Sequence, residues 1–465
     1  MLRCCCRAMG LFFLIVFASL PAVFAAQTAV SDAGTTSIDD ANSQQYGVEV
    51  SGGNAIVLTV SNGVNINSFT PAPLPDAVTT TNYTGGNLTL TCSGTSTFYG
   101  NIASAAHPLT VLNVGAAGAT DTFNRISLPD ADADVYATTV NITGGGTLAL
   151  GAGVSLTGNV YNTGAPNTGT LTAGGWDVIN GSVGTAGSPL ATLNLGYQAE
   201  CTGAVYAQNI NINSSSSYDW SSGNATGTIN LQSGAIIISN SNVTGDVKNI
   251  SGTANKGKLV FSSTAAADRS MTGTVGSAAA PLLQVDVDVA SGQKVVFSGP
   301  IYAQDIDIGQ LYGRTGTGEF TGDLHGNLNF RADGGARIGS GVAVSGAITN
   351  SSGSNYRGTL SYLGAAAITG NIGSGAATGS LKGVNFNGAT SLGANVYAQT
   401  TTIAAGTTTV SSPVTVTGAL VNNATLNLGT SGLSVTGTYT QSSGSVLSTT
   451  ISDASTYGRI SVSGN

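Results

Sequence analysis

The feature that most constrains the fold of this chain is a short pattern, apolar-x-Gly-x-apolar, that returns at a steady interval. It reads Leu-Thr-Gly-Asn-Val around Gly158 and Ile-Asn-Gly-Ser-Val around Gly181. The pattern recurs at Gly203, Gly227, Gly245, Gly273, Gly299, Gly322, Gly346, Gly370, Gly393, Gly418 and Gly437. The 279 residues from Gly158 to Gly437 hold 12 steps, or about 23 residues per step. A period in this range predicts a solenoid in which each step is one turn.

The residues beside these glycines indicate that the turns are built from strands. Apolar residues stand two positions before the Gly at Leu156, Ile179, Cys201, Ala225, Val243, Met271, Phe297, Phe320, Val344, Ile368, Val416 and Val435. They stand two positions after it at Val160, Val183, Val205, Ile229, Val247, Val275, Ile301, Leu324, Ile348 and Ile372. Side chains two apart share one face of a strand, so both sets are expected to point inward. The sequence therefore predicts an all-β fold, a parallel β-helix or β-solenoid with about 23 residues per turn, whose stacked turns bury one aliphatic column.

A slower repeat is superimposed on the first. It reads Val-Tyr-Ala-Thr, Val-Tyr-Ala-Gln or Ile-Tyr-Ala-Gln and begins at Val135, Val205, Ile301 and Val396. Each copy follows a segment similar to Gly-x-Val-Gly-Ser-Ala-x-x-Pro-Leu that begins at Gly100, Gly181, Gly273 and Gly370, with intervals of 81, 92 and 97 residues. The long unit therefore spans about four turns and indicates duplication of a block. Its tyrosines are expected to face outward, either as an aromatic stripe for ligand stacking or, as we favour, packed against loops.

The first residues have the pattern of a secretion signal. Arg3 and Arg7 precede an apolar stretch, Leu11–Leu20, and small residues around Ala25 suit a signal peptidase. No later stretch reaches about 18 uninterrupted apolar residues, so no transmembrane segment is expected in the mature chain. We therefore expect a signal peptide at 1–26, an N-terminal cap and Pro-rich linker at 27–76, and the β-solenoid at 77–465.

Composition supports an exported, strand-rich chain and argues against some partners. Only 8% of the residues are charged and 66 are Gly, so the charge that decorates amphipathic helices is missing. The formal net charge is −8, and no cluster of Lys and Arg is visible along the sequence. Nucleic acid and anionic lipid are therefore poor partners.

The acidic residues offer the only candidate chemistry. Asp130, Asp132 and Asp134 alternate and form a weak Ca²⁺ candidate, although they lack the glycine and glutamate of an EF-type loop. The pairs Asp286/Asp288 and Asp305/Asp307 also alternate and are expected on the solvent face of their strands. Paired carboxylates can hydrolyse glycosides, but the basic residues that accompany them in β-helical polysaccharide-cleaving enzymes are scattered here.

Cysteine and histidine do not indicate a catalytic or metal site. Cys92 and Cys201 fall on the inward side of their expected strands, where free thiols are expected, and the turns between them exclude a disulfide. His107 and His325 belong to no metal-ligand pattern and are expected at the surface. No cofactor is expected.

The C-terminal part of the chain resembles a known family. The segments Gly-Thr-Tyr-Thr-Gln-Ser-Ser-Gly-Ser-Val-Leu, from Gly437, and Tyr-Gly-Arg-Ile-Ser-Val-Ser-Gly, from Tyr457, are similar to the ends of type V autotransporter passengers. The ladder from about residue 80 onward is similar to their strand repeats. The resemblance implies a right-handed parallel β-helix, secretion across two membranes and frequently adhesion. The membrane barrel typical of the family does not precede Asn465, so a separate or missing β-barrel translocator is expected.

These observations favour an exported β-solenoid surface protein, adhesin-like or structural and without catalysis. We expect it at the cell surface or outer membrane, or outside the cell, with a host or cell-surface glycan or protein as its partner. Two alternatives stay open: a β-helical polysaccharide-active enzyme, either lyase or hydrolase, and a Ca²⁺-dependent surface lattice protein.

Overall fold

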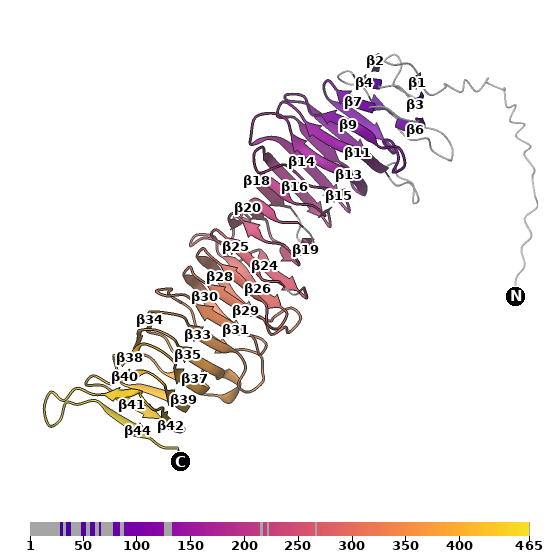
Figure 1. The fold of residues 1–465 in the computed structure, drawn as a ribbon. Coiled ribbons are helices and arrows are strands. Elements are labelled where there is room, and N and C mark those ends of the chain that lie inside the picture. The colour runs from indigo at the N-terminus through magenta and orange to yellow at the C-terminus, as the bar shows by residue number, and fades with distance from the viewer. Residues whose placement is uncertain are drawn as a thin grey trace, which may run out of the picture.

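The chain folds as an elongated parallel β-solenoid of about 16 turns (Figure 1). The computed structural model describes residues 28–464 except for 31–33, 39–47, 53–55, 61–64, 67–77, 84–87, 125–132, 214–216, 221–222 and 266. The expected signal peptide, 1–26, and the Pro-rich linker at 70–75 lie outside the described residues. One 3-10 turn, Ala377–Gly379, is the helical content of the described part. Within it, no helix has the length and apolar character needed to span a bilayer.

The strands pair in parallel and stack along the rod. An eight-stranded sheet contains β2 (Gly34–Ile38), β4 (Ile56–Val60), β7 (Leu88–Cys92), β9 (Leu109–Val114), β11 (Ala133–Ile142), β13 (Val154–Asn162), β15 (Val178–Asn180) and β17 (Glu200–Cys201). A seven-stranded sheet contains β19 (Ser217–Trp220), β21 (Ala235–Ile238), β24 (Lys258–Ser263), β26 (Leu282–Val289), β28 (Ile301–Ile308), β30 (Leu324–Phe330) and β32 (Ile348–Asn350). A five-stranded sheet contains β34 (Ala366–Ile368), β36 (Thr390–Leu392), β38 (Thr407–Val410), β40 (Thr425–Asn427) and β43 (Val446–Ser448).

The remaining strands form one short sheet and one long series. The short sheet contains β1 (Thr28–Val30), β3 (Val48–Gly52) and β6 (Val78–Tyr83). The long series contains β5 (Asn65–Ile66), β8 (Ser96–Tyr99), β10 (Thr120–Asn124), β12 (Thr147–Leu150), β14 (Thr168–Gly175), β16 (Leu190–Tyr197), β18 (Val205–Ile212), β20 (Ala225–Leu231), β22 (Val243–Thr244), β23 (Val247–Asn249), β25 (Arg269–Thr272), β27 (Lys294–Phe297), β29 (Thr317–Phe320), β31 (Gly335–Ile338), β33 (Thr359–Tyr362), β35 (Leu381–Phe386), β37 (Val396–Ile403), β39 (Val414–Asn422), β41 (Gly432–Val435), β42 (Tyr439–Gln441) and β44 (Arg459–Val462).

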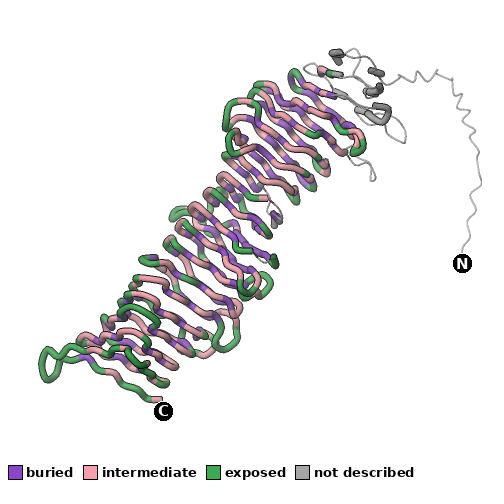
Figure 2. The backbone as a smooth tube through the Cα atoms, in the orientation of Figure 1, coloured by how far each residue is buried: buried purple, intermediate pink, exposed green. Residues whose placement is uncertain are grey.

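The core is one continuous apolar cluster inside the coil, and buried positions alternate with half-buried ones along the strands (Figure 2). Aromatic rings within this cluster pack against one another. The ring of Phe297 lies 5.5 Å from that of Phe261 and 5.3 Å from that of Phe320, measured between centroids. Cys92 and Cys201 are buried, as the inward pattern predicted, and neither forms a disulfide. The repeat therefore works as expected: no single turn encloses a core, and stacking supplies it.

The slower repeat marks a β-bulge. The pairing register shifts directly after the tyrosine of each Val-Tyr-Ala segment, at Tyr136, Tyr206, Tyr302 and Tyr397. A glycine of the next turn faces each bulge: Gly158, Gly227, Gly326 and Gly418. At Gly227 a Cβ atom would lie 1.7 Å from the carbonyl oxygen of Ala207, and the residue has φ +136°. Only glycine fits there, because the bulged backbone occupies the space of a side chain.

These bulges correct the single glycine ladder expected from the sequence. Gly181 stacks on Gly158, but Gly227 stacks on Ala207 and begins a new column. That column continues through Gly245, Gly273, Gly299 and Gly322, and further columns begin at Gly326 and Gly418. Counting all 13 glycines as one column was therefore wrong. The turns average about 22 residues.

The same shift moves one of the inward positions. Val205 pairs with Val183 before it and with Ala225 after it, and Ile229 pairs with Ile210. The sequence alignment had placed Ile229 after Val205, which is four residues too far. Both residues are nevertheless buried, because the displacement is an even number of residues and preserves the face of the strand.

The four repeated tyrosines do not form an aromatic stripe. Their partners on the following turn are Thr157, Thr226, His325 and Thr417. Tyr302 stacks on His325 with ring centroids 4.3 Å apart, and each tyrosine is half-buried. The tyrosines thus cover the outside of the bulged turns.

Strands of the expected N-terminal cap share a sheet with the solenoid. β2 pairs with β4, and β4 pairs with β7 with five residues in register from Ile56 to Val60. Leu58 and Val60 are fully buried. The apolar interior therefore extends to residues before 77.

Candidate functional site

Equivalent strands of successive blocks present the same outward positions. In β14, β16, β18 and β20 these positions form a ladder of Thr172, Asn194, Asn211 and Asn230, here called the amide ladder. Asn211 donates its Nδ2 to Asn194 Oδ1 at 2.8 Å, and Asn230 donates to Asn211 Oδ1 at 2.8 Å. Asn194 donates to Thr172 Oγ1 at 3.1 Å. Because a side-chain amide both donates and accepts, the ladder completes its own hydrogen bonds from turn to turn.

The next block replaces this ladder with charged residues. Asp286, Asp307 and Asn329 of β26, β28 and β30 pair side by side, as Asn194, Asn211 and Asn230 do in the block before. The neighbouring outward positions add further charge. We call the resulting set the charged face: Lys258, Gln284, Asp286, Asp288, Asp305, Asp307 and Arg331.

A loop covers part of the charged face. The connection from β28 to β29 comprises residues 309–316, whereas the equivalent connection from β37 to β38 comprises residues 404–406. Asp286 accepts the backbone N–H groups of Gln310 at 3.0 Å and Leu311 at 2.9 Å. Asp288 accepts those of Tyr312 at 2.9 Å and Arg314 at 3.0 Å. Four backbone amides therefore anchor the 309–316 loop to two carboxylates.

The expectation that Asp286 and Asp288 lie on the solvent face is wrong. Their side chains leave the outer side of β26, but they are 1% and 0% exposed because the 309–316 loop lies over them. Arg314 adds to the cover: its Nη1 donates to Ser262 Oγ at 2.7 Å and lies 3.7 Å from Asp288 Oδ2. Asp307 is also buried, at 1% exposed.

A polar pocket of about 300 Å³ opens beside the loop, lined by Lys258, Leu283, Gln284, Asp305, Asp307, Gln310 and Arg331. On its floor, Asp307 accepts hydrogen bonds from Gln284 Nε2 at 2.6 Å and from Arg331 Nε at 3.1 Å. Asp305 Oδ1 accepts from the amide of Asn329 at 3.0 Å. Two carboxylates and two cations thus meet in one pocket.

Burial dominates the electrostatics of these carboxyl groups. It raises the pKa of Asp286 to about 7, assisted by the nearby charges of Asp288 and Asp307 and opposed by the N–H of Gln310. Burial also raises the pKa of Asp307 above its ordinary value, although the cation of Arg331 opposes the rise. Such shifts accompany functional carboxyl groups and structural ones alike.

The basic residues are less scattered than the sequence suggested. Ten of the 14 Lys and Arg residues fall between Lys248 and Lys382, and the ion pairs of the described residues all lie within 246–382. Arg331 Nε lies 3.1 Å from Asp307 Oδ1, and Lys258 lines the same pocket as Asp305 and Asp307. The scatter of Lys and Arg along the sequence therefore did not indicate that two of them share a pocket with this acidic pair.

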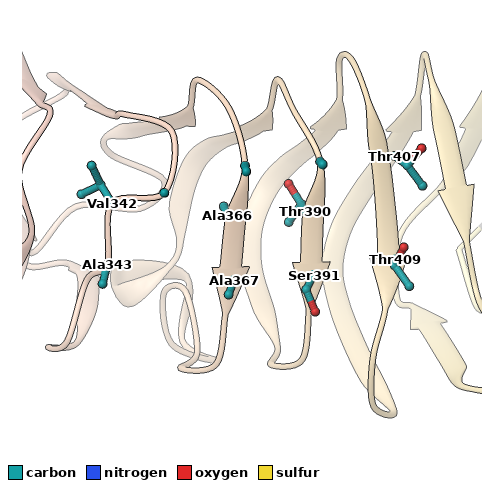
Figure 3. Close-up of a pocket in the computed structure, with 11 residues that line it drawn as sticks. Val342, Ala343, Ala366, Ala367, Thr390, Ser391, Thr407 and Thr409 are labelled. Carbon is teal, nitrogen blue, oxygen red and sulfur yellow. The ribbon is translucent and has the colours of Figure 1, made fainter.

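A larger groove lies over β34, β36 and β38 and offers less chemistry (Figure 3). It has a volume of about 560 Å³. Its lining consists of small side chains and one valine: Gly341, Val342, Ala343, Ala365, Ala366, Ala367, Ala389, Thr390, Ser391, Thr407 and Thr409. No charged or aromatic side chain borders it, so it presents only hydroxyls and methyl groups.

The other sequence candidates do not gather into a site. Asp130 and Asp132 lie outside the described residues, and Asp134 accepts a hydrogen bond from Tyr136 Oη at 2.8 Å. Among the residues that the structure describes, no three His, Cys, Asp or Glu side chains are placed to hold a metal ion. His325 stacks on Tyr302, and His107 lies in the turn before Pro108.

The sequence did contain a signal for the charged face. Aligning the duplicated blocks places Gln284, Asp286, Asp305 and Asp307 opposite Thr192, Asn194, Asn209 and Asn211. The same alignment shows that the 309–316 loop is longer than its counterpart at 404–406. The acidic residues and the longer loop are thus two departures from the repeat, and both occur in the same block.

No protein-family model, curated protein or solved structure matches the chain. The β-solenoid is therefore the part of the passenger resemblance that the structure confirms.

Proposed function

We propose that this chain is an exported, adhesin-like surface protein that acts by binding rather than by catalysis. The observation that carries the proposal is the concentration of charged side chains on one block of an otherwise weakly charged rod. A repetitive scaffold with one divergent face suits a protein that displays a binding site at a distance from its attachment. The partner is a glycan or protein of a host or cell surface.

The rigidity of the rod supports this role. The interior is continuous over the stacked turns, and amide ladders such as Asn194–Asn211–Asn230 link the turns on the outside. A rod of this kind holds the charged face in a fixed orientation without ordering cost on binding.

Attachment of coated particles tests the proposal. Beads coated with the purified mature chain should attach to epithelial cells or extracellular matrix in a saturable manner, and free chain should compete. Beads coated with albumin are the control. Attachment no greater than that of the albumin beads on every surface would overturn the adhesive function.

A polysaccharide-active enzyme is the second candidate, and one observation favours it. The pocket brings the carboxylates of Asp305 and Asp307 together with Arg331 and Lys258, which are the residue types such chemistry requires. Incubation with polysaccharides, followed by assay of reducing ends and of unsaturated products, separates the two candidates. Turnover that Asp307→Asn abolishes would support the enzyme, and its absence on all substrates would support the binding protein.

A further inference from the structure

The pocket beside the 309–316 loop contains polar groups with unused hydrogen-bonding capacity. Within the described residues, no hydrogen bond or ion pair engages the ammonium group of Lys258 or the side-chain amide of Gln310. Asp305 uses one carboxylate oxygen, Oδ1, to accept from Asn327 and Asn329. Donors and acceptors therefore line the same small space.

The pocket is electrically balanced. Lys258 and Arg331 contribute two positive charges, and Asp305 and Asp307 contribute two negative charges. An anionic ligand would meet the two carboxylates, and a cationic ligand would meet the ammonium and guanidinium groups. A neutral ligand rich in groups that both donate and accept hydrogen bonds suits this arrangement best.

An exposed aromatic ring lies on the loop that borders the pocket. Tyr312 is two residues after Gln310 and is 62% exposed, although its backbone N–H is anchored to Asp288. The guanidinium of Arg314 lies over the ring, 4.6 Å from its centroid. The backbone anchor and the guanidinium hold the aromatic side chain in place while most of it remains in contact with solvent.

We propose that the pocket formed by Lys258, Gln284, Asp305, Gln310 and Arg331, together with Tyr312, binds one neutral sugar residue of a glycan. This inference rests on the proposed adhesin-like function and names its ligand. Amide, carboxylate and guanidinium groups converge on hydroxyls, and the tyrosine ring offers an apolar surface for the C–H groups of the sugar. A volume of about 300 Å³ suits a ligand of this size.

Binding of defined oligosaccharides to the purified mature chain tests the site. Titration calorimetry with neutral hexasaccharides of glucose, mannose and galactose should detect saturable binding of at least one. Tyr312→Ala and Gln310→Ala should each weaken that binding about 10-fold or more. The control Tyr457→Ala removes another exposed tyrosine and should leave it unchanged. Circular dichroism and melting temperature should confirm that all variants fold.

Several outcomes would overturn the inference. The inference fails if no neutral hexasaccharide binds, or if Tyr312→Ala and Gln310→Ala bind as tightly as the wild-type chain. It also fails if the chain prefers an oligogalacturonate or an oligolysine peptide. If coated beads still attach to cells, the adhesive function survives and only the sugar site fails. If the hexasaccharide binds as expected but the beads do not attach, the site stands and the adhesive function fails.

Discussion

The amide ladder of β16, β18 and β20 and the charged face of β26, β28 and β30 have the same backbone pairing but opposite ways of satisfying their side chains. Asn194 and Asn211 donate and accept along the rod, so they need nothing from outside the sheet. When ionised, Asp286 and Asp307 can only accept hydrogen bonds, and they repel each other across adjacent turns. They require donors from elsewhere, which Gln284, Arg331 and the 309–316 loop provide.

The difference between the amide ladder and the charged face shows how one block of a repetitive fold can develop a binding surface. Replacement of the side-chain amides of two Asn residues by the carboxylates of Asp286 and Asp307 turns a ladder that satisfies its own hydrogen bonds into a surface that needs donors from a loop. The interior need not change, because inward residues such as Leu193 and Val285 are fully buried in both blocks. Divergence on the outside is therefore compatible with an unaltered core.

The largest expected effect tests what the two blocks share. Gly227→Ala and Gly326→Ala each place a Cβ within 2.0 Å of the carbonyl oxygen of Ala207 or Ala303. Each should lower the free energy of unfolding by more than about 4 kcal/mol, because the bulged backbone cannot retreat. The control Gly313→Ala meets open space at φ +69° and should cost about 1–2 kcal/mol. Denaturant unfolding measures all three, and equal costs would show that the bulges are not close-packed.

Core truncation comes next and compares the interiors of the two blocks. Phe297→Ala, behind the charged face, should cost about 3–5 kcal/mol, and Leu195→Ala, behind the amide ladder, about 2–5 kcal/mol. Tyr206→Ala should cost less, because its side chain is half-buried on the outside. Thermal unfolding gives the ranking, and a Tyr206→Ala cost equal to that of Phe297→Ala would mean that the inward register is wrong.

Removing one anchor of the 309–316 loop should affect the block with the charged face and not the block with the amide ladder. Asp288→Asn leaves only one oxygen for the N–H groups of Tyr312 and Arg314, and it weakens the contact with the guanidinium. We expect a loss of about 1–3 kcal/mol and faster tryptic cleavage after Arg314. The matched change in the ladder, Asn211→Asp, should leave cleavage at Arg314 unchanged. Cleavage at the wild-type rate in Asp288→Asn would contradict the anchoring of the loop.

The smallest expected effect, measured over a single pH unit, is a pH dependence of stability that arises from the charged face. The folded-state pKa of Asp286, about 7, is above its ordinary value of 3.8, so the folded chain retains a proton that the unfolded chain loses. Stability should therefore fall as pH rises from about 4 to 7, with a slope approaching 1.4 kcal/mol per pH unit from this group. Asp286→Asn should remove the contribution of Asp286 to this slope. The contribution of Asp177 should remain, because burial raises the pKa of Asp177 to about 6. Denaturant unfolding at several pH values measures the slope, and identical slopes in wild type and Asp286→Asn would contradict the assignment of this pH dependence to Asp286.

The fold was predictable because inward positions repeat. Leu156 and Ile179 fill equivalent places, and any chain with that period must stack its turns to bury them. The bulges were visible as Val-Tyr-Ala segments, but their four-residue shift was not, since Val205 and Ile229 both look like correct inward partners. A shift of this kind depends on where the backbone adds a residue, which the apolar pattern does not record.

The charged face was only half predictable. The sequence placed Asp286 and Asp288 on the solvent face of their strand; their carboxylates do meet the 309–316 loop outside the strand, but that loop buries them. Their burial depends on a loop that folds back across the sheet, a contact between residues about 24 apart on neighbouring turns. The segment 309–316 contains glycines at 309, 313 and 316, but nothing in their spacing indicates the direction in which the loop folds.

Amide hydrogen exchange with and without a bound glycan tests the central claim most directly, because it reports on both blocks in one measurement. With the neutral hexasaccharide that binds most tightly, the account predicts new protection in peptides covering the 309–316 loop and β28. It predicts unchanged exchange in peptides covering β16, β18 and β20. Protection of equal size over the amide ladder would contradict the claim that one divergent block of an otherwise uniform rod carries the binding site.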